Sequence, residues 1–343
     1  MPSPRVAAAS PADIPTTQRA TIRDVAAMAR VSVATVSRYV NRKQRFTAEV
    51  EGRIAAAITA TGYHSHPVAR SMSTGRSGAV AALVAGVGSA HAAALVKGLC
   101  RVALAGGHDL ICVDPVLHSG AALREVERVL AMQIDGLVLA ASLPPDALAR
   151  LASDPRPQVD LDGMEADAAH PPQRMAGALL ARYLIAHGHR RIAFLACDDQ
   201  AGSEARLQGV REALADAALP PPVLHHAAAA SAAAGAAAAS AVLLSRGRPD
   251  AVIACNDALA MGLVSEARAL GIAVPAAVSV AGIGNMPFGR YLLPALTSVD
   301  LHADAMGAAA MTLLLAAVVG DAPRGDAAVV PEPRLVVRGS TRG

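Results

Sequence analysis

The sequence predicts two structural parts, a small all-α unit near the N-terminus and a larger, two-lobed α/β body with parallel sheets. Apolar residues within residues 21–63 recur at helical spacing, whereas from residue 79 onward short apolar runs alternate with helical stretches. Charge is divided in the same way, because residues 1–76 hold eleven Lys and Arg against four acids, a net +7, and the remainder is −4. A basic helical unit joined to a mildly acidic body indicates a polyanion-binding module attached to a different module.

Composition excludes several classes of protein. With 343 residues, 53% hydrophobic and 17% charged, the chain has enough apolar surface for two or three folded domains. No unbroken apolar run of about 18 residues is present, which argues against a membrane protein. Residues 1–20 are rich in Pro and Ala without a signal-like apolar core, and we expect a disordered tail. Four scattered cysteines without a C-x-x-C pair favour a reducing, cytoplasmic location over a disulfide or zinc framework.

Three short helices are predicted in the basic segment. Thr21, Ser32 and Thr47 are residue types that cap helix N-termini, and each precedes an apolar helical pattern. Only the turn Arg30–Val31 separates the first two helices. This spacing matches a helix-turn-helix, in which the second helix enters the DNA major groove. Such a unit can also serve protein contacts alone, but its charge favours DNA.

The stretch from Thr21 to Asn41 resembles the N-terminal headpiece of the LacI family of bacterial transcriptional regulators. Its core is Val31-Ser32-x-x-Thr35-Val36-Ser37-Arg38, and the resemblance continues through Gly62-Tyr63, Val68-Ala69-Arg70-Ser71 and most of the body. The resemblance implies a DNA-binding regulator, most often a repressor, that binds a pseudo-palindromic operator as a homodimer and responds to a small polar metabolite. The family often has Gly where Arg30 stands, and this Arg either contacts a phosphate or is solvated.

The resemblance also implies which side chains contact DNA. Arg38 can bond guanine O6 and N7 together, while Val33 and Ala34 can contact thymine methyl groups or exclude water. Short polar side chains on the same helix suit phosphate contacts. The full set, including part of the following linker, is Ser32, Val33, Ala34, Thr35, Ser37, Arg38, Asn41, Ala69, Arg70 and Met72.

Residues 64–78 read as a linker with a short helix. By the resemblance this is a hinge helix that orders on operator DNA and lies in the minor groove. Met72 is apolar and long enough to unstack a base step as a wedge. The alternative is a free linker in which Met72 packs on the body.

Residues 79–343 alternate strand and helix, with a break near Pro171-Pro172. The predicted strands are Ala79–Ala85, Asp109–Asp114, Gly136–Ala140, Gln158–Asp162, Arg191–Cys197, Ala251–Cys255 and Val278–Ile283, and the clearest helices are Ala92–Ala105, Ala121–Met132, Ala176–His187, Ser203–Ala217 and Ala258–Ala269. Such continuous apolar strands predict parallel sheets, with ligands at the strands' carboxyl ends. The Ala-rich stretch predicts a surface helix from about Gly235. By the resemblance the body is periplasmic-binding-protein-like, with lobe 1 at about 79–172 and 301–326 and lobe 2 at about 173–300 and 327–343.

Five positions are candidates for binding the effector by the same resemblance: His91, Asp162, Arg206, Asn256 and Gly284. Arg206 lies in a family-like S-x-x-R-x-x-G pattern, and its guanidinium can hold a carboxylate or vicinal hydroxyls. The alternative is a surface Arg paired with Glu212 or Asp216. Asp162 follows a strand and either faces the cleft or forms a turn. Asn256 resembles a ligand-contacting residue, and the residue after it, Asp257, is expected to cap the next helix.

The expected effector is a sugar acid such as gluconate. Gly284 stands where many family members have an Asp that binds sugar hydroxyls, and His91 stands where an aromatic platform is common. Loss of an acid beside Arg206 favours an anion, and Gly284 also resembles the gluconate-repressor branch of the family. A neutral sugar or a nucleoside is the alternative effector.

A dinucleotide-binding dehydrogenase is the competing function. Gly86-Val87-Gly88 follows a strand, but the third Gly of the fingerprint is replaced by His91. No His/Cys cluster has metal-binding spacing, and His187 and His189 flank a helix stop, where they more readily cover the helix C-terminus. We therefore expect a binding protein without catalytic residues, metal, cofactor or membrane partner. Because the sequence stops soon after Arg338, we expect a dimer rather than a tetramer.

Overall fold

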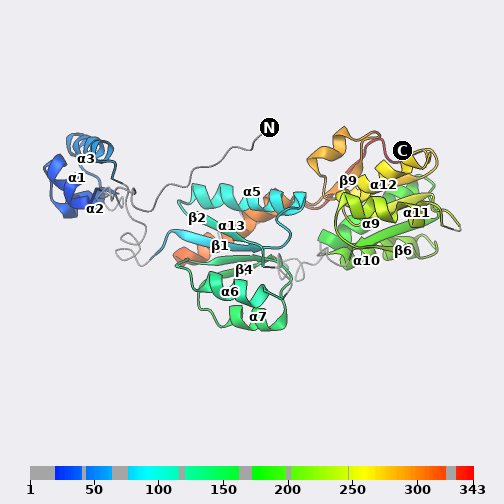
Figure 1. Cartoon of the computed structure of the whole chain (residues 1–343), viewed down its shortest axis with the longest axis horizontal. Helices are drawn as coiled ribbons and strands as arrows, with labels where there is room; N and C mark the ends of the chain where they lie inside the picture. The colour runs from blue at the N-terminus through cyan, green and yellow to red at the C-terminus, as the bar shows by residue number, and fades with distance from the viewer. Residues whose placement is uncertain are drawn as a thin grey trace, which may run out of the picture. The chain divides into compact units, whose positions relative to one another are not determined.

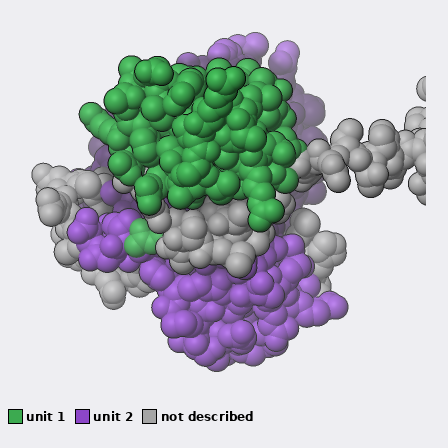
Figure 2. Space-filling view, turned by 90° about the vertical axis from the view of Figure 1, so that its left-hand side faces the viewer, with its two compact units in different colours: residues 1–77 green, residues 78–343 purple. Residues whose placement is uncertain are grey.

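The computed structural model describes residues 20–40, 44–63, 76–115, 120–161, 172–197, 202–245, 247–321 and 330–343. The chain divides into two compact units, Met1–Ser77 and Gly78–Gly343, which Figure 2 colours separately. Among the described residues, no helix is both long and apolar enough to cross a membrane.

The first unit contains the three predicted helices, α1 (Ile22–Ala29), α2 (Val33–Val40) and α3 (Ala48–Thr61) (Figure 1). One apolar side chain from each helix, Val25, Val36 and Ile54, is fully buried in a common small core. The helical apolar periodicity of the sequence therefore corresponds to the inner face of this unit.

Of the three predicted N-caps, only Ser32 caps its helix as expected, because Thr47 precedes α3 without a capping bond from its side chain. The Ser32 hydroxyl accepts a 3.0 Å hydrogen bond from the Thr35 N–H, as a cap of α2 should. At α1 the Asp24 carboxylate reaches back instead, and it accepts both the Thr21 N–H at 2.7 Å and the Thr21 hydroxyl at 2.8 Å. These bonds lower the pKa of Asp24 from its ordinary value. An acid in the first helical turn also suits the helix dipole.

The first sheet of the second unit is fully parallel, in the order β2-β1-β3-β4. Its strands are β1 (Ala79–Val84), β2 (Asp109–Val113), β3 (Leu137–Ala140) and β4 (Gln158–Asp160), and its helices are α5 (Ala90–Ala105), α6 (Ala122–Leu130), α7 (Pro145–Ala152) and α13 (Ala303–Val319). Helices α5 and α13 cover one face and α6 and α7 the other, as Figure 1 shows. The apolar runs of β1 and β3 follow from this double coverage.

The second sheet has the order β10-β9-β8-β7-β5-β6, and only β10 is antiparallel to its neighbour. Its strands are β5 (Ile192–Cys197), β6 (Val223–Ala227), β7 (Ala251–Ala254), β8 (Ser279–Ile283), β9 (Thr297–Asp300) and β10 (Arg334–Val336), and its helices are α9 (Pro172–Ala186), α10 (Ser203–Asp216), α11 (Ala232–Leu243) and α12 (Asp257–Ala269). Phe194 is fully buried in the core of this sheet. The two mainly parallel sheets confirm the predicted fold class.

The chain returns to the first sheet after β9. Strand β9 ends at Asp300, α13 then packs on α5, and β10 pairs with β9, with Leu335 opposite Val299. The crossing near Leu301 was expected from the resemblance, whereas the expected return near residue 327 lies outside the described residues.

Three helix pairs pack with their backbones in direct contact. In α5–α13, α9–α10 and α11–α12, each helix contributes a glycine at which an added Cβ would overlap a backbone carbonyl of the partner helix. These pairs are Gly98 with Gly307, Gly177 with Gly209, and Gly235 with Gly262. The Ala-rich stretch forms a helix as predicted, α11, with one face exposed and Gly235 on its inner face packed directly against α12.

Candidate DNA interface and effector site

Helix α2 exposes the side chains that the sequence assigns to base edges. Val36 points into the core, while Val33, 42% exposed, lies with Ala34 and Arg38 on the outer surface. Ala34 and Arg38 are four positions apart and share a helix face, and Val33 is exposed next to them in the first turn of the helix. A guanidinium beside two small apolar groups can read a guanine next to a thymine.

The polar residues of α2 have local roles as well. The Ser32 and Thr35 hydroxyl oxygens lie 2.8 Å apart, and Ser32 also caps the helix. Ser32 is exposed, and Thr35 and Ser37 are half-buried. Of the other predicted DNA contacts, Asn41, Ala69, Arg70 and Met72 lie outside the described residues.

Arg30 closes α1 in the left-handed region, with φ 53° and ψ 47°. Its N–H donates back to the carbonyls of Ala26 and Ala27. This conformation is the one for which glycine is ordinarily selected, and it explains why a glycine at this turn would be favourable. The Arg30 side chain itself is exposed.

Arg206, in the second unit, is only 2% exposed. Its Nε–H donates to Gln173 Oε1 at 2.8 Å, and its NH1 group donates to the Cys255 carbonyl. The alternative of a surface Arg paired with Glu212 or Asp216 is therefore wrong. Those acids pair with other arginines, Arg174 and Arg182.

His91, in the first turn of α5, lies within electrostatic reach of Arg206. Burial, followed by the positive charge of Arg206, lowers the pKa of His91 to about 4. His91 is thus neutral at pH 7 and offers one ring nitrogen as a donor and the other as an acceptor. The charge of Arg206, in the second-sheet half of the body, therefore acts on His91, in the first-sheet half.

At α12 the cap is Asn256 and not the expected Asp257. Asn256 has an extended backbone and caps the helix, because its Oδ1 accepts the Leu259 N–H at 2.8 Å. Asp257, expected as the cap, is buried at the first helical position instead. Its carboxylate accepts the Ser298 hydroxyl at 2.6 Å and the Met286 N–H at 2.5 Å. Burial raises the pKa of Asp257 despite these bonds.

Asp257 also changes the surroundings of Gly284. Gly284 has φ 129°, a conformation that side chains rarely adopt, and a Cβ there would lie 3.8 Å from Asp257 Oδ2. The carboxylate that Gly284 lacks is therefore supplied nearby by a different residue. The negative charge of Asp257 opposes the preference for an anion that the missing acid at Gly284 predicts. Asp162, the remaining candidate, lies outside the described residues.

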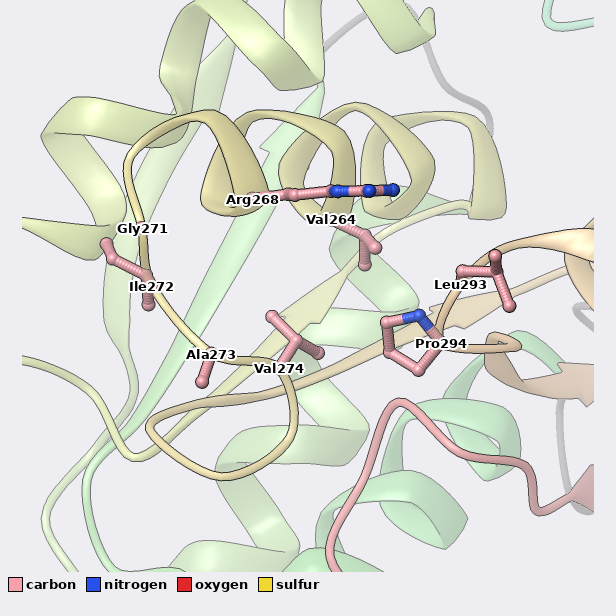
Figure 3. A pocket seen from close by; sticks show the side chains of 8 residues that line it. All are labelled: Val264, Arg268, Gly271, Ile272, Ala273, Val274, Leu293 and Pro294. Carbon is pink, nitrogen blue, oxygen red and sulfur yellow. The ribbon is translucent and has the colours of Figure 1, made fainter.

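A separate hollow of about 300 Å³ lies at the C-terminal end of α12. Figure 3 shows Arg268 extending above Val264, with Leu293 and Pro294 on the opposite wall. None of the five candidate effector residues lines it. This hollow is therefore not the site that the sequence predicts.

The histidines near the end of α9 are structural. His187 Nδ1 lies 2.8 Å from the Tyr183 carbonyl, where it covers the helix C-terminus as expected. His189 is fully buried between Asp250, at 3.4 Å, and the Ser279 hydroxyl, at 3.1 Å. Burial lowers the pKa of His189. In the part of the chain that the structure describes, no three His, Cys, Asp or Glu side chains are placed to hold a metal ion.

Comparison with known proteins gives a consistent result over both units. Residues 21–66 match the model for bacterial regulatory proteins of the lacI family, and residues 181–341 match a periplasmic-binding-protein-like domain. The chain is 31% identical to the transcriptional regulator GalR of Escherichia coli, over 94% of this chain and 95% of GalR. It is 29% identical to the transcriptional repressor PurR of Klebsiella pneumoniae, over 94% and 96% of the two chains.

Two solved structures resemble the chain over most of its length. The lac repressor dimer bound to operator and the anti-inducer ONPF is 25% identical, with a TM-score of 0.81, covering 95% of this chain and 100% of that one. The transcription regulator GntR of Chromobacterium violaceum is 27% identical, with a TM-score of 0.70, covering 77% of this chain and 100% of that one.

Proposed function

Because the chain belongs to the LacI family of bacterial transcriptional regulators, we propose that it is a homodimeric repressor whose affinity for a pseudo-palindromic operator is controlled by a small polar metabolite. The membership itself makes the chain a DNA-binding regulator with an effector-binding body. It also confirms that the chain is not an enzyme and excludes the dehydrogenase alternative. A regulator of bacterial DNA works in the cytoplasm, which is the location that we propose.

The exposed surface of α2 is the observation that carries the DNA-binding role. Val33, Ala34 and Arg38 face outward on a unit whose segment has a net charge of +7. The similar lac repressor structure is a dimer bound to operator. A dimer presents two copies of this surface, so the site it reads is a pseudo-palindrome.

The hinge contributes to this proposal from the sequence alone. We place Ala69, Arg70 and Met72 in the minor groove, with Met72 as the wedge at a flexible pyrimidine–purine step. Met72→Ala should then weaken specific binding much more than non-specific binding, and equal losses would contradict the wedge.

Gel-shift titration with a selected operator tests the DNA-reading surface. Arg38→Ala should weaken the free energy of operator binding by about 1–3 kcal/mol and relax selectivity at one base pair in each half-site. Arg53, an exposed residue of α3, provides the matched control. Arg53→Ala should leave base selectivity unchanged. If the Arg38→Ala protein keeps the base preferences of the wild type, Arg38 of α2 does not determine sequence selectivity.

The effector that we propose is a sugar acid such as gluconate. The two acceptors named for Arg206, the Gln173 amide and the Cys255 carbonyl, are neutral, and His91 is neutral as well. A guanidinium is well suited to a carboxylate, to which it can donate two parallel hydrogen bonds. The buried Asp257 opposes this preference.

A neutral sugar is the alternative, and one observation favours it. A CelR–cellobiose complex is 25% identical to this chain, with a TM-score of 0.67, covering 94% of this chain and 100% of that one. Calorimetry with gluconate, 2-ketogluconate, glucose, ribose and adenosine separates the alternatives. We expect binding of a sugar acid that is lost in Arg206→Ala. Binding of glucose, ribose or adenosine without any sugar acid would refute the proposal.

A further inference from the structure

Asn285 follows the candidate effector residue Gly284 in the turn after β8. It is half-buried and has φ 47°, in the left-handed region that Asn adopts more readily than most other residues. Its backbone N–H donates to the Ser298 hydroxyl oxygen at 2.9 Å, and this hydroxyl donates to Asp257 at 2.6 Å. The turn that carries Gly284 and Asn285 is therefore fixed to the start of α12.

The Asn285 side chain uses both ends of its amide. Its Nδ2 group donates to Asp300 Oδ2 at 3.0 Å, and its Oδ1 accepts a hydrogen bond from the NH2 group of Arg338 at 2.7 Å. The amide thus lies between an anion and a cation, with its donor toward the anion and its acceptor toward the cation. A carboxylate at this position would repel Asp300, and an apolar side chain would bond neither partner.

Both partners of the amide lie where the chain passes between the two halves of the body. Asp300 ends β9, and α13, which follows, packs on α5 in the first-sheet half. Arg338 follows β10, the strand that comes after α13 in the chain and pairs with β9. The NH1 group of Arg338 also donates to the Leu296 carbonyl at 2.6 Å. One amide therefore joins the turn after β8 to the outgoing and the returning segment.

Residues 300–302, which we call the crossover, depend on the Asp300 carboxylate. While Asp300 Oδ2 accepts from Asn285, its Oδ1 accepts the His302 N–H at 2.8 Å. His302 has φ 55° and ψ 41° directly before α13, a conformation that side chains rarely adopt. Such a conformation persists only where its surroundings hold it. Asn285 thus restrains the carboxylate that fixes the start of α13.

We propose that Asn285 is a positioning residue that couples the turn carrying Gly284 to the crossover, so that a displacement of this turn by the effector is passed to α13 and the first-sheet half. Strand β1 of that half directly follows the N-terminal unit in the chain. The regulatory consequence rests on the effector role proposed for Gly284. A variant that breaks the amide contacts should still bind the effector but should respond to it less.

The first test needs no effector. Amide exchange of His302, measured by NMR in the full chain, reports whether Asp300 still holds the crossover. Asn285→Asp places a carboxylate against Asp300, and His302 should then exchange about 10- to 100-fold faster, the change expected for loss of a hydrogen bond to a charged group. Gln208→Glu is the matched control, because it makes the same amide-to-acid change at an exposed position of α10. It should leave the exchange of His302 unchanged.

Exchanging the two side chains gives a rescue variant. When Asn285→Asp is combined with Asp300→Asn, the acid at position 285 accepts from Arg338, and the amide at position 300 donates to that acid and accepts the His302 N–H. Charge and hydrogen bonds equal those of the wild type, so slow exchange should return. Slow exchange in Asn285→Asp, or fast exchange in the double variant, would overturn the positioning role.

A second variant covers the case in which the acid at position 285 prevents folding. Asn285→Gly removes the amide, and glycine suits the positive φ of this position. His302 should exchange faster in Asn285→Gly as well. Exchange at the wild-type rate in this variant would refute the role of the Asn285 amide.

Gel-shift titration with and without saturating gluconate measures the coupling itself. The effector-induced change in operator affinity is typically about 5- to 150-fold in coupled systems. It should fall toward one in Asn285→Asp and return in the double variant, while calorimetry still finds gluconate bound. A full response to bound gluconate in Asn285→Asp would overturn the transmission. A wild type that does not bind gluconate would instead refute the proposed effector, and the exchange of His302 would still decide whether Asn285 holds the crossover.

Discussion

Arg30 stands in a backbone conformation that disfavours every side chain. At φ 53° and ψ 47° a Cβ costs roughly 1–2 kcal/mol relative to glycine. Arg30→Gly should therefore stabilise the N-terminal unit by about 1 kcal/mol, measured as slower amide exchange in α1 and α2.

The same variant separates the two roles left open for the Arg30 side chain. If it contacts a phosphate, the salt dependence of operator binding falls by about one counterion per protomer in Arg30→Gly. If it is solvated, the slope does not change. A destabilised N-terminal unit would contradict the account of strain at this turn.

Two histidines couple stability to pH. Burial lowers the pKa of His189, and burial with the charge of Arg206 lowers that of His91 to about 4, whereas both titrate near 6.5 in an unfolded chain. Below about pH 6.5 the unfolded state thus binds more protons, so the free energy of unfolding falls as the pH falls. The melting temperature should drop between pH 7 and 5, and drop less in His91→Gln. Equal melting temperatures at pH 7 and 5 would contradict this account.

Residue chemistry in the sequence predicts some of the effector site and misses the rest. The S-x-x-R-x-x-G pattern singles out Arg206, which the structure buries. Asn256 and Asp257 are both good caps, and only the backbone at the end of β7 decides between them. Gln173 gives no signal, because a Gln in a helix is usually solvated and its partner is 33 residues away.

At the scale of elements, the continuous apolar strands are the predictable part of the fold. Strands β1, β5, β7 and β8 are buried on both faces, so they appear as apolar runs. Strand β9 is not predicted, because its side chains are polar and bond to the distant C-terminal residues. The Thr297 hydroxyl donates to the Arg338 carbonyl at 3.1 Å, for example. The edge strand β6 is not predicted either, because a His pair interrupts its apolar pattern.

The surroundings of two helical glycines predict opposite effects of a Gly→Ala substitution on stability. Gly177→Ala should destabilise the body by at least about 1–3 kcal/mol, because the added methyl group overlaps the Arg206 carbonyl and pushes α9 from α10. Gly52, in α3, has open space around it, so Gly52→Ala should stabilise the N-terminal unit by about 0.5–1 kcal/mol. Thermal unfolding measures both.

Effector affinity is a second property in which these two variants should differ. Because Gly177 lies against the backbone of Arg206, the Gly177→Ala protein should also lose effector affinity, whereas Gly52→Ala should not. A Gly177→Ala protein as stable as the wild type would show that α9 and α10 can separate without cost.

At the scale of the molecule, the basic and acidic charge divides between the two units. The N-terminal segment holds the basic excess, while the body exposes three large apolar side chains close together in sequence. These are Phe288, Tyr291 and Leu293, which are 66%, 76% and 79% exposed. Phe288 and Tyr291 belong to the 3₁₀ helix η1 (Pro287–Tyr291), and Leu293 also lines the hollow of Figure 3. A cluster of this kind ordinarily marks a protein contact.

We place a second copy of the chain on this cluster. The placement is testable because a dimer contacts both half-sites of the operator, whereas a monomer contacts one. Tyr291→Asp puts a charge into the contact and should give a folded monomer in sedimentation experiments. A monomer reads one half-site and releases about half as many counterions, so the slope of log affinity against log salt should fall to about half. Leu148, exposed on α7, is the control, and Leu148→Asp should keep both the dimer and the slope. If Tyr291→Asp stays dimeric with the full slope, the dimer contact lies on another face. If it becomes monomeric with the full slope, each chain binds DNA independently and a pseudo-palindromic operator is not required.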